Sequence, residues 1–188
     1  MNHMGTRHIE TERLILRVFT LDDAPAMYQN WANDPDVTRF LTWPPHGNNR
    51  ITKDLLDEWI AHYTESDYYQ WGIASKENGE VIGSIAVVRL NESIDEAELG
   101  YCCGKAWWGQ GIMTEACRAV IRYLFEEVSC KRISACHDIN NPASGRVMQK
   151  SGMQYEGVLR RAGRNNQGIV DIAVYSILQE EFRAQNDQ

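Results

Sequence analysis

Long apolar runs are missing from this chain of 188 residues. No run approaches the roughly 18 consecutive apolar residues that a membrane-spanning helix needs, and the first residues lack the apolar centre of a secretory signal peptide. Hydrophobic residues make up 43% of the chain and aromatic residues 10%, which is normal for a globular protein and argues against wholesale disorder. The sequence therefore predicts a folded cytoplasmic protein that does not associate with a membrane.

Cysteine is scarce, and its spacing is typical of neither a disulfide framework nor a metal site. The chain has 5 cysteines, an odd number, and it contains no Cys-x-x-Cys or His-x-x-x-His pair. We therefore expect free thiols in a reducing compartment and no bound metal. Cys102 and Cys103 are adjacent in a predicted strand, so their side chains should face opposite ways.

Runs of basic residues are missing as well. The formal net charge is −7, which argues against a nucleic-acid partner. An acidic surface suits a cationic partner such as an amine-bearing substrate. It is equally common among proteins with no such partner, so the charge alone names no substrate.

Hydrophobic periodicity predicts one mixed α/β domain over residues 1–188, with a core spanning about residues 8–180. Seven strands are predicted, at residues 14–18, 69–75, 81–90, 97–103, 131–138, 153–159 and 169–178. Helices are predicted at residues 21–33, 53–63 and 112–128 and after Asn141. We expect an Asn78-Gly79 hairpin between the second and third strands, and exposed loops at 41–49 and 160–168.

The most informative segment joins the strand that ends at Cys103 to the helix at 112. Gly109 and Gly111 lie where the strand gives way to the helix. A helix start leaves backbone N–H groups unpaired at the positive end of the helix dipole, and glycines let a phosphate approach them closely. A nucleotide P-loop is excluded because no Lys-Ser or Lys-Thr follows, and Thr114 replaces the third glycine of a dinucleotide-binding loop. A plain strand-to-helix turn is the alternative interpretation.

A second block follows the next predicted strand. Asn141 is a predicted N-cap, Pro142 suits the first helical position, and Gly152 suits the helix end with Lys150 in the last turn. A capped helix explains this block without a ligand. Two such blocks in this order are nevertheless more specific than either alone.

Together these blocks resemble the GNAT acetyltransferase superfamily. The segment from Trp108 to Ala116 matches the form W-G-x-G-x-x-T-E-A that is common in the RimJ/RimL-type branch, which acetylates protein N-termini. Trp108 and Met113 depart from the general superfamily pattern [QR]-x-x-G-x-[GA]. The N-x-x-S and K-x-G segments of the superfamily match Asn141, Ser144, Lys150 and Gly152. The resemblance implies the acyl-CoA N-acyltransferase fold, a mixed central sheet of about seven strands with helices on both faces.

The resemblance further implies transfer of an acetyl group from acetyl-CoA to a primary amine by direct attack. The favoured acceptor is a protein or peptide N-terminal amine. The alternatives are a small amine, such as a polyamine, amino acid or aminoglycoside, and a non-catalytic acyl-CoA sensor of the same fold. The protein would be a monomer or a homodimer. Acetyl-CoA would be held by Tyr101, Cys102, Cys103, Trp108, Gly109, Gln110, Gly111, Ile112, Met113, Thr114, Asn141, Ser144 and Lys150.

Three residues are candidates for the chemistry. Glu98, on the strand before the glycine loop, is the candidate base, and a solvent-facing strand carboxylate is the alternative interpretation. A backbone N–H near Tyr101 or Cys102 would stabilise the thioester oxygen. Ser144, and Tyr101 as second choice, would supply a proton to the leaving thiolate. Cys102 and Cys103 are expected to be small buried residues rather than acyl carriers.

Acceptor selection should come from the first two helices, the loop between them and the 160–168 loop. Trp31 and Trp59 lie at helical spacing with other apolar residues, which indicates the core. Trp43 and His46 lie in a proline-rich loop and are candidates for a substrate wall. Some relatives that act on ribosomal proteins carry an acid after a basic-x-Ala stretch, and Gly163 occupies that position here.

Overall fold

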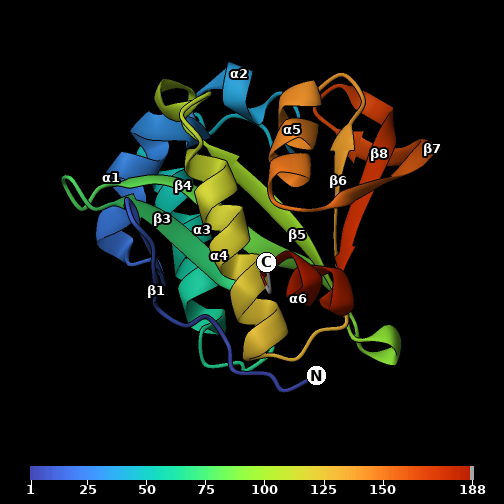
Figure 1. The fold of residues 1–188 in the computed structure, drawn as a ribbon. Coiled ribbons are helices and arrows are strands. Elements are labelled where there is room, and N and C mark those ends of the chain that lie inside the picture. Colours follow the sequence, from blue (N-terminus) through green and yellow to red (C-terminus); the bar gives the residue numbers. More distant parts are fainter. Residues whose placement is uncertain (187–188) are drawn as a thin grey trace.

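The computed structural model describes residues 1–186 and builds them around one mixed sheet of eight strands (Figure 1). The strands are β1 (Ile9–Glu10), β2 (Leu14–Arg17), β3 (Gln70–Ser75), β4 (Val81–Asn91), β5 (Glu96–Cys103), β6 (Arg132–Asp138), β7 (Gln154–Asn165) and β8 (Gly168–Leu178). Their order across the sheet is β1-β2-β3-β4-β5-β6-β8-β7. Neighbours are antiparallel except β5 and β6, which are parallel. The expected mixed sheet is confirmed, and the added strand is the two-residue β1.

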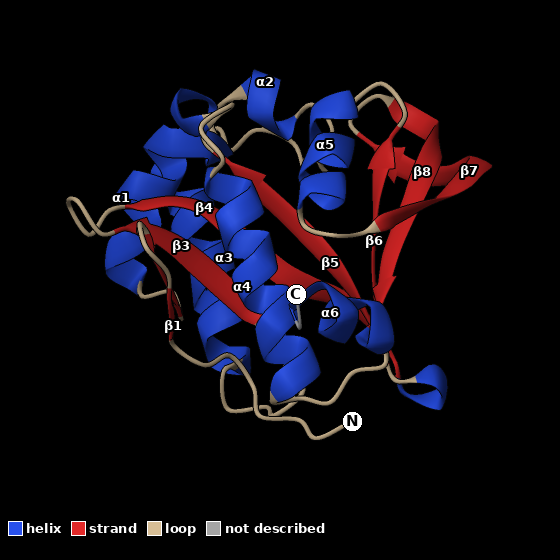
Figure 2. Ribbon diagram, in the orientation of Figure 1, coloured by secondary structure: helices blue, strands red, loops and turns tan. Residues whose placement is uncertain are grey.

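Helices cover both faces of this sheet (Figure 2), as expected. One face carries α4 (Ile112–Glu126), α5 (Pro142–Lys150) and α6 (Gln179–Asn186). The opposite face carries α1 (Ala24–Met27) and α3 (Asn49–His62), and the short α2 (Pro35–Thr38) lies between them in the chain. Within residues 1–186, no helix is both long enough and apolar enough to cross a membrane.

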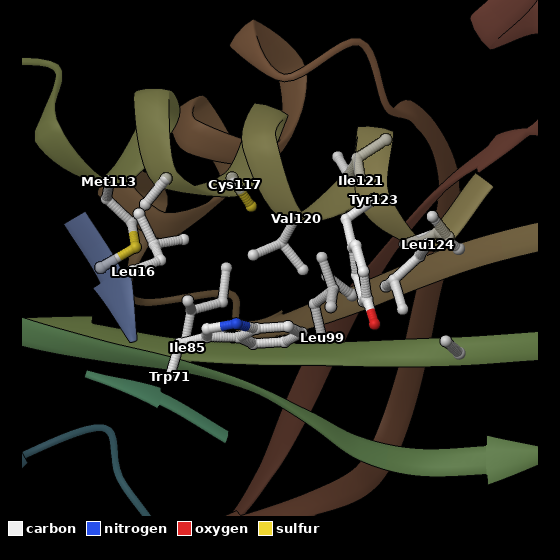
Figure 3. Packing of buried hydrophobic residues seen from close by; sticks show 14 of the residues in the cluster. Leu16, Trp71, Ile85, Leu99, Met113, Cys117, Val120, Ile121, Tyr123 and Leu124 are labelled. Carbon is white, nitrogen blue, oxygen red and sulfur yellow. The ribbon is translucent and has the colours of Figure 1, made fainter. Parts of the chain in front are cut away.

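The larger core lies between α4 and the sheet (Figure 3). Val120 and Leu124 of α4 are fully buried and face Trp71 of β3 and Leu99 of β5. Apolar residues at helical spacing give α4 one continuous buried side, which fixes how the helix lies on the sheet. A second core around Trp31, which is 0% exposed, fills the space between the opposite face and the helices α1 and α3.

Two helices, α3 and α2, begin at residues that the hydrophobic pattern did not predict, because a side chain caps each of them there. α3 begins at Asn49 rather than at 53, because the Asn48 side chain accepts hydrogen bonds from the backbone N–H groups of Arg50 and Ile51 at 3.0 and 3.2 Å. The helix at 21–33 forms, but as successive 3₁₀, α and π turns. α2 was not expected; Asp34 caps it by accepting from the Asp36 N–H at 2.8 Å. α6 was not expected either.

The prediction of an exposed loop at residues 160–168 is wrong. β7 continues to Asn165, and only Asn166 and Gln167 form the turn into β8. The pairing of β7 with β8 shifts register between Leu159 and Gly163, and Arg161 has φ 52°. This bulge accommodates the polar stretch that the sequence presents as a loop.

Candidate active site

The two parallel strands separate part-way along their length. β5 and β6 pair from Glu96–Arg132 to Leu99–Ala135 and then diverge, although β5 continues to Cys103 and β6 to Asp138. The start of α4 and the whole of α5 lie at the open end (Figure 1). Within residues 1–186, no strand therefore lies beside this edge of β5, the one that pairs with β6, from residue 100 onwards.

A cavity of about 1040 Å³ occupies this opening. Side chains alternate along β5, so Tyr101 and Cys103 approach it from the α4 side of the sheet, and Glu98 and Cys102 from the opposite side. The opposite orientation of the two adjacent cysteines is thus confirmed. Every residue predicted above to bind acetyl-CoA or to act in catalysis lines this cavity, with the exception of Gln110.

The glycine loop adopts the backbone geometry that an anion site requires. Gly109 and Gly111 have φ 74° and 79°, in the left-handed region that favours glycine, and Gly111 immediately precedes α4. The side chains of Ile112 and Met113 turn into the core and are 7% and 6% exposed. These two residues can therefore offer a ligand their backbone N–H groups, at the positive end of the helix dipole.

A brace from the first hairpin holds this loop in place. Arg13 Nη1 donates to the Gln110 carbonyl at 3.0 Å, and Arg13 Nε donates to Glu115 Oε2 at 2.7 Å. Thr11 Oγ1 donates to Glu115 Oε1 at 2.6 Å. Burial alone would raise the pKa of Glu115, but the hydrogen bonds from Thr11 and Arg13 lower it below its usual value. Gln110 itself turns back to donate to the Ala106 carbonyl at 2.7 Å, which explains its absence from the cavity lining.

The structure brings two of the candidate catalytic residues together. Tyr101 Oη donates to the Ser144 carbonyl at 3.0 Å, and Ser144 Oγ donates to Tyr101 Oη at 3.2 Å. Burial raises the pKa of Tyr101 well above its usual value, so its hydroxyl keeps its proton at neutral pH. Ser144 is in the first turn of α5, so this pair ties β5 to α5 across the opening.

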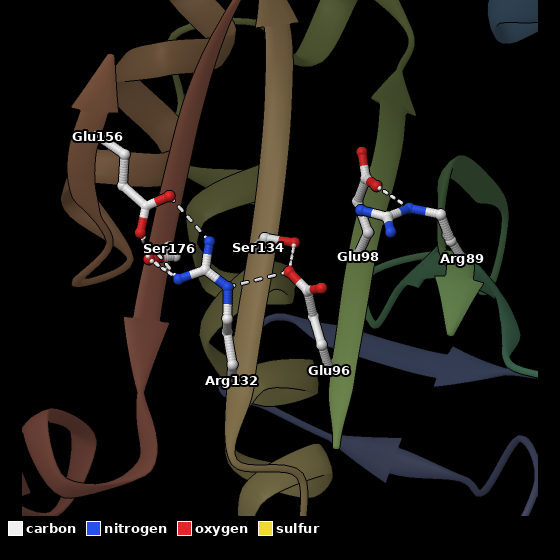
Figure 4. Close-up of polar contacts among 7 residues, drawn as sticks. All are labelled: Arg89, Glu96, Glu98, Arg132, Ser134, Glu156 and Ser176. Carbon is white, nitrogen blue, oxygen red and sulfur yellow. Dashed lines mark hydrogen bonds and ion pairs between the residues drawn. The ribbon is translucent and has the colours of Figure 1, made fainter. Parts of the chain in front are cut away.

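Glu98 lies on the other face of β5 and has two partners, of which Figure 4 shows Arg89. Arg89 Nε donates to Glu98 Oε2 at 2.8 Å, and Cys136 Sγ donates to Glu98 Oε1 at 3.3 Å. The pairing of β4 with β5 shifts register between Val87 and Arg89, and that bulge sets Arg89 opposite Glu98. With a side chain 19% exposed, Glu98 is neither fully buried nor the freely solvent-facing carboxylate of the alternative interpretation.

A denser polar network, not expected from the sequence, crosses the same face further along (Figure 4). Arg132 Nε donates to Glu96 at 3.0 Å, and both of its terminal nitrogens donate to Glu156 at 2.8 Å. Ser134 Oγ donates to Glu96 at 2.8 Å and Ser176 Oγ donates to Glu156 at 2.6 Å. Hydrogen bonds from Arg132, and then from Ser176, lower the pKa of Glu156 to about 2.

Residues 13–154 match the sequence profile of the acetyltransferase (GNAT) domain. The chain belongs to the GNAT acetyltransferase family. It is 34% identical to the N-acetyltransferase YoaA of Bacillus subtilis over 170 residues, which cover 90% of this chain and 96% of YoaA. It is also 34% identical to the [ribosomal protein uS5]-alanine N-acetyltransferase of Escherichia coli over 158 residues, 79% of each chain. This GNAT chain is thus an acetyl-CoA-dependent N-acetyltransferase.

The fold also matches solved GNAT structures. RimL, a ribosomal L7/L12 α-N-protein acetyltransferase solved in complex with coenzyme A, superposes with a TM-score of 0.80 at 20% identity, covering 92% of this chain and 98% of RimL. At that identity the likeness concerns the fold alone. It shows that this GNAT domain shares its overall fold with RimL.

The open end of the GNAT sheet fits an acyl-CoA by its own geometry. A Cβ placed on Gly109 would meet nothing within 4 Å, so the loop leaves free space in front of the α4 N-terminus. Asn141 occupies the N-cap position of α5, as expected, but its side chain makes no capping hydrogen bond, and within the described chain it has no other partner. Lys150 lines the same cavity and adds positive charge. These groups suit a phosphorylated, amide-containing ligand.

Only one of the two residues predicted to form a substrate wall lines the cavity. Trp43 lines the cavity, as expected. His46 does not belong to the wall: it is 7% exposed and its Nδ1 lies 2.7 Å from Thr52 Oγ1, beneath Trp43. Burial lowers the pKa of His46, which keeps it neutral at pH 7. Trp59 packs against the second core as predicted and also reaches the cavity.

Gly163 lies on the same side, in β7. A Cβ at that position would lie 2.5 Å from Ile172 Cγ2, so the Ile172 side chain would have to move to admit the acid that some relatives carry there.

Proposed function

We propose that this enzyme acetylates the α-amine at the N-terminus of a protein or peptide, using acetyl-CoA as donor. The observation that carries the proposal is the continuous cavity, which runs from the glycine loop at the start of α4 to the carboxylate of Glu98. The names of relatives support the acceptor class, because the E. coli proteins are a ribosomal-protein-serine acetyltransferase and an alanine N-acetyltransferase.

The binding roles follow from the placement of each group. The backbone N–H groups of Gly111 to Thr114 would hold the pyrophosphate, with Lys150 nearby, and Trp108, whose Nε1 donates to the Cys103 carbonyl at 2.9 Å, would brace the loop. The edge of β5 at residues 101–103 and the amide of Asn141 would align the pantetheine arm.

The transfer forms one bond and breaks another. The amine nitrogen, after losing a proton to Glu98 directly or through a water, attacks the thioester carbon; the new N–C bond forms and the C–S bond breaks. A backbone N–H near Tyr101 or Cys102 would stabilise the negative charge on the carbonyl oxygen. The leaving thiolate would take its proton from Ser144 or Tyr101.

The cysteines support direct transfer rather than an acyl-cysteine step. Burial raises the pKa of Cys102 to about 11 and that of Cys103 to about 12. Both thiols are therefore protonated at neutral pH and are poor nucleophiles. The attacking amine needs no such relay.

The proposal is tested by measuring release of free CoA from acetyl-CoA. The acceptors are lysine-free peptides that begin with alanine or serine, the same peptides with an acetylated N-terminus, and a panel of polyamines, amino acids and aminoglycosides. We expect release with the free peptides and none with the blocked ones. Release with small amines but not with peptides would mean that the acceptor is a small amine and not a protein N-terminus. Micromolar acetyl-CoA binding without release would favour the sensor interpretation.

A further inference from the structure

A buried glutamine that lines the cavity has an amide group without a partner. Gln70, the first residue of β3, is only 8% exposed and belongs to the cavity lining. Within residues 1–186 its side-chain amide makes no hydrogen bond, and the bonds to Thr6 and Tyr63 use its backbone. An unpaired buried amide destabilises a fold, so such groups are rare in folded proteins. The amide of Gln70 is thus available to a molecule in the cavity.

A second glutamine shows how the fold accommodates an amide that it uses for itself. Gln179 is also 8% exposed, but its Oε1 accepts from Lys131 Nζ at 3.0 Å and its Nε2 donates to the Phe125 carbonyl at 3.3 Å. Gln179 is the first residue of α6 and lies outside this cavity. At equal burial, the amide away from the cavity is paired and the amide in the cavity is not.

The backbone of Gln70 is fixed on both sides. Its N–H donates to Thr6 Oγ1 at 2.9 Å, and its carbonyl accepts from Tyr63 Oη at 2.9 Å. The residue also pairs with Ala86 of β4. The point from which the amide extends is therefore set before a ligand binds, which reduces the entropy lost on binding.

Small residues cover the sheet between Gln70 and the opening beside β5. Ala86 lies opposite Gln70, and Gly100 lies opposite Ala86, just where β5 separates from β6. Residues directly opposite one another share a face of the sheet, and Glu98, two positions before Gly100, lies on the same face. Both small residues line the cavity, with Val88 beside Gly100. A chain can therefore lie across the three strands, from the carboxylate to the amide.

The width of this path indicates which part of an acceptor the amide meets. Neighbouring strands lie about 4.8 Å apart, so β3 is roughly 10 Å from β5. An extended peptide advances about 3.3 Å per residue, so it covers that distance in about three residues. A glutamine amide both donates and accepts, which matches the N–H and the carbonyl of a peptide group. An acceptor whose amine lies at the opening therefore presents one of its first peptide groups to Gln70.

We propose that Gln70 is a specificity-determining residue that hydrogen-bonds a peptide group within the first three residues of the acceptor. This inference rests on the proposed N-terminal acetyltransferase function. It makes the acceptor a peptide chain and not an isolated amine, because a polyamine has no amide and leaves Gln70 unpaired. A site built to hydrogen-bond its substrate discriminates against an analogue that lacks the bonding group.

The test compares Gln70→Met and Gln70→Leu with the matched control Gln179→Met. Methionine and leucine are close to glutamine in size but carry no amide. The substrates are a lysine-free peptide that begins with alanine and three analogues of it, in which an ester replaces the peptide bond after the first, the second or the fifth residue. An ester lacks the N–H donor of a peptide group. Release of CoA gives kcat/KM, and thermal unfolding gives Tm.

We expect both Gln70 variants to lower kcat/KM for the all-amide peptide about 10- to 100-fold, the effect of leaving a buried amide unpaired. KM for acetyl-CoA should not change. In the unsubstituted enzyme, an ester after the first or the second residue should lower kcat/KM about tenfold, and in Gln70→Met the same ester should cost less than about twofold. The ester after the fifth residue should have no effect in either protein.

Stability distinguishes a binding residue from a structural one. Gln70→Met should have the Tm of the unsubstituted protein or a higher one, because the substitution removes an unpaired buried amide. Gln179→Met breaks two hydrogen bonds and should lower Tm by about 2–4 °C without changing kcat/KM.

The outcomes separate this inference from the proposed function. Unchanged peptide turnover in both Gln70 variants, or ester losses of the same size with and without Gln70, would overturn the role of Gln70 and leave the proposed function standing. A lower Tm with an equal loss for all four substrates would also overturn it and assign Gln70 a structural role. An unsubstituted enzyme that acetylates small amines and none of the peptides would overturn the proposed acceptor class and this inference together.

Discussion

The part of the cavity that we propose to hold acetyl-CoA (the cofactor half) and the part that we propose to receive the amine (the acceptor half) are built from different groups. The cofactor half uses backbone: two glycines in left-handed conformation, the first N–H groups of α4 and the unpaired edge of β5. The acceptor half uses side chains from separate elements, such as Gln70 on β3, Arg89 on β4 and Glu98 on β5. A site made of backbone groups is formed by consecutive residues, so it can be recognised in the sequence. A site made of side chains from separate strands is assembled only when the sheet forms.

The largest expected effect tests the cofactor half. In Gly111→Trp, the indole would fill the space in front of the α4 N-terminus, and we expect acetyl-CoA binding to weaken at least 100-fold, since both the cradle and its anion contacts are lost. Titration calorimetry measures this. Gly79→Trp is the control: Gly79 has φ 75° in the β3–β4 turn and open space around it, so it carries the same backbone strain away from the site. If Gly111→Trp bound acetyl-CoA as tightly as the unsubstituted protein, the glycine loop would not be the site that binds the cofactor.

The next effect tests the acceptor half. Glu98→Gln keeps the side-chain shape but removes the group that would accept the proton, so we expect kcat to fall about 10²- to 10⁴-fold. Acetyl-CoA affinity should remain within threefold, because the carboxylate lies on the face of β5 away from the glycine loop. Steady-state CoA release and calorimetry on the same preparation check both statements. A kcat within threefold of the unsubstituted enzyme would assign the base elsewhere.

The same contrast explains what the sequence could and could not predict. Gly109, Gly111 and the strand-to-helix boundary are local, so the glycine loop and its place before α4 were predictable. The partners of Glu98 were not, because Arg89 reaches it only through a bulge in β4 and Cys136 only through the parallel pairing of β5 with β6. His46 was misassigned because a proline-rich loop gives no sign that Thr52 will bury its imidazole.

A second wrong prediction, the loop at residues 160–168, comes from an irregular strand pairing. The stretch 160–168 has the composition of a loop, yet it forms β7 because a bulge at Leu159–Gly163 lets it pair with β8. The sequence therefore predicted an exposed loop where the structure has a strand and a two-residue turn. That error concealed the hydrogen bonds from Asn166 to the carbonyls of Thr38 and Trp43, since they depend on the exact point at which the hairpin turns.

A smaller loss of kcat is expected at the boundary between the two halves, where the hydroxyls of Tyr101 and Ser144 are hydrogen-bonded. If Tyr101 supplies the proton to the leaving thiolate, Tyr101→Phe should lower kcat about tenfold to a hundredfold, the size of one charge-assisted hydrogen bond, with acetyl-CoA affinity nearly unchanged. Ser144→Ala keeps the hydroxyl of Tyr101, so it should have the weaker effect. The reverse ranking in single-turnover rates would give the role to Ser144.

The last comparison concerns stability and lies within the acceptor half. Arg132→Met leaves Glu96, whose side chain is 9% exposed, without its counter-charge, so we expect a loss of about 3 kcal/mol in the free energy of unfolding. Arg89→Met removes an arginine that is 57% exposed and should cost less than about 1 kcal/mol. Urea unfolding of the two variants measures the difference between a network held in the sheet and an ion pair at its rim.

Acid titration then tests the cause of that difference. Hydrogen bonds from Arg132 and Ser176 lower the pKa of Glu156 to about 2 from its usual 4.5, so the unfolded chain binds the proton more tightly than the folded protein does. The stability that this carboxylate contributes is therefore complete above pH 4.5 and is lost as the pH falls towards 2. The gap in Tm between the unsubstituted protein and Arg132→Met should narrow over that interval. A gap that stays constant from pH 7 to below pH 3 would mean that Arg132 stabilises the sheet by packing of its aliphatic stem, not by its charge.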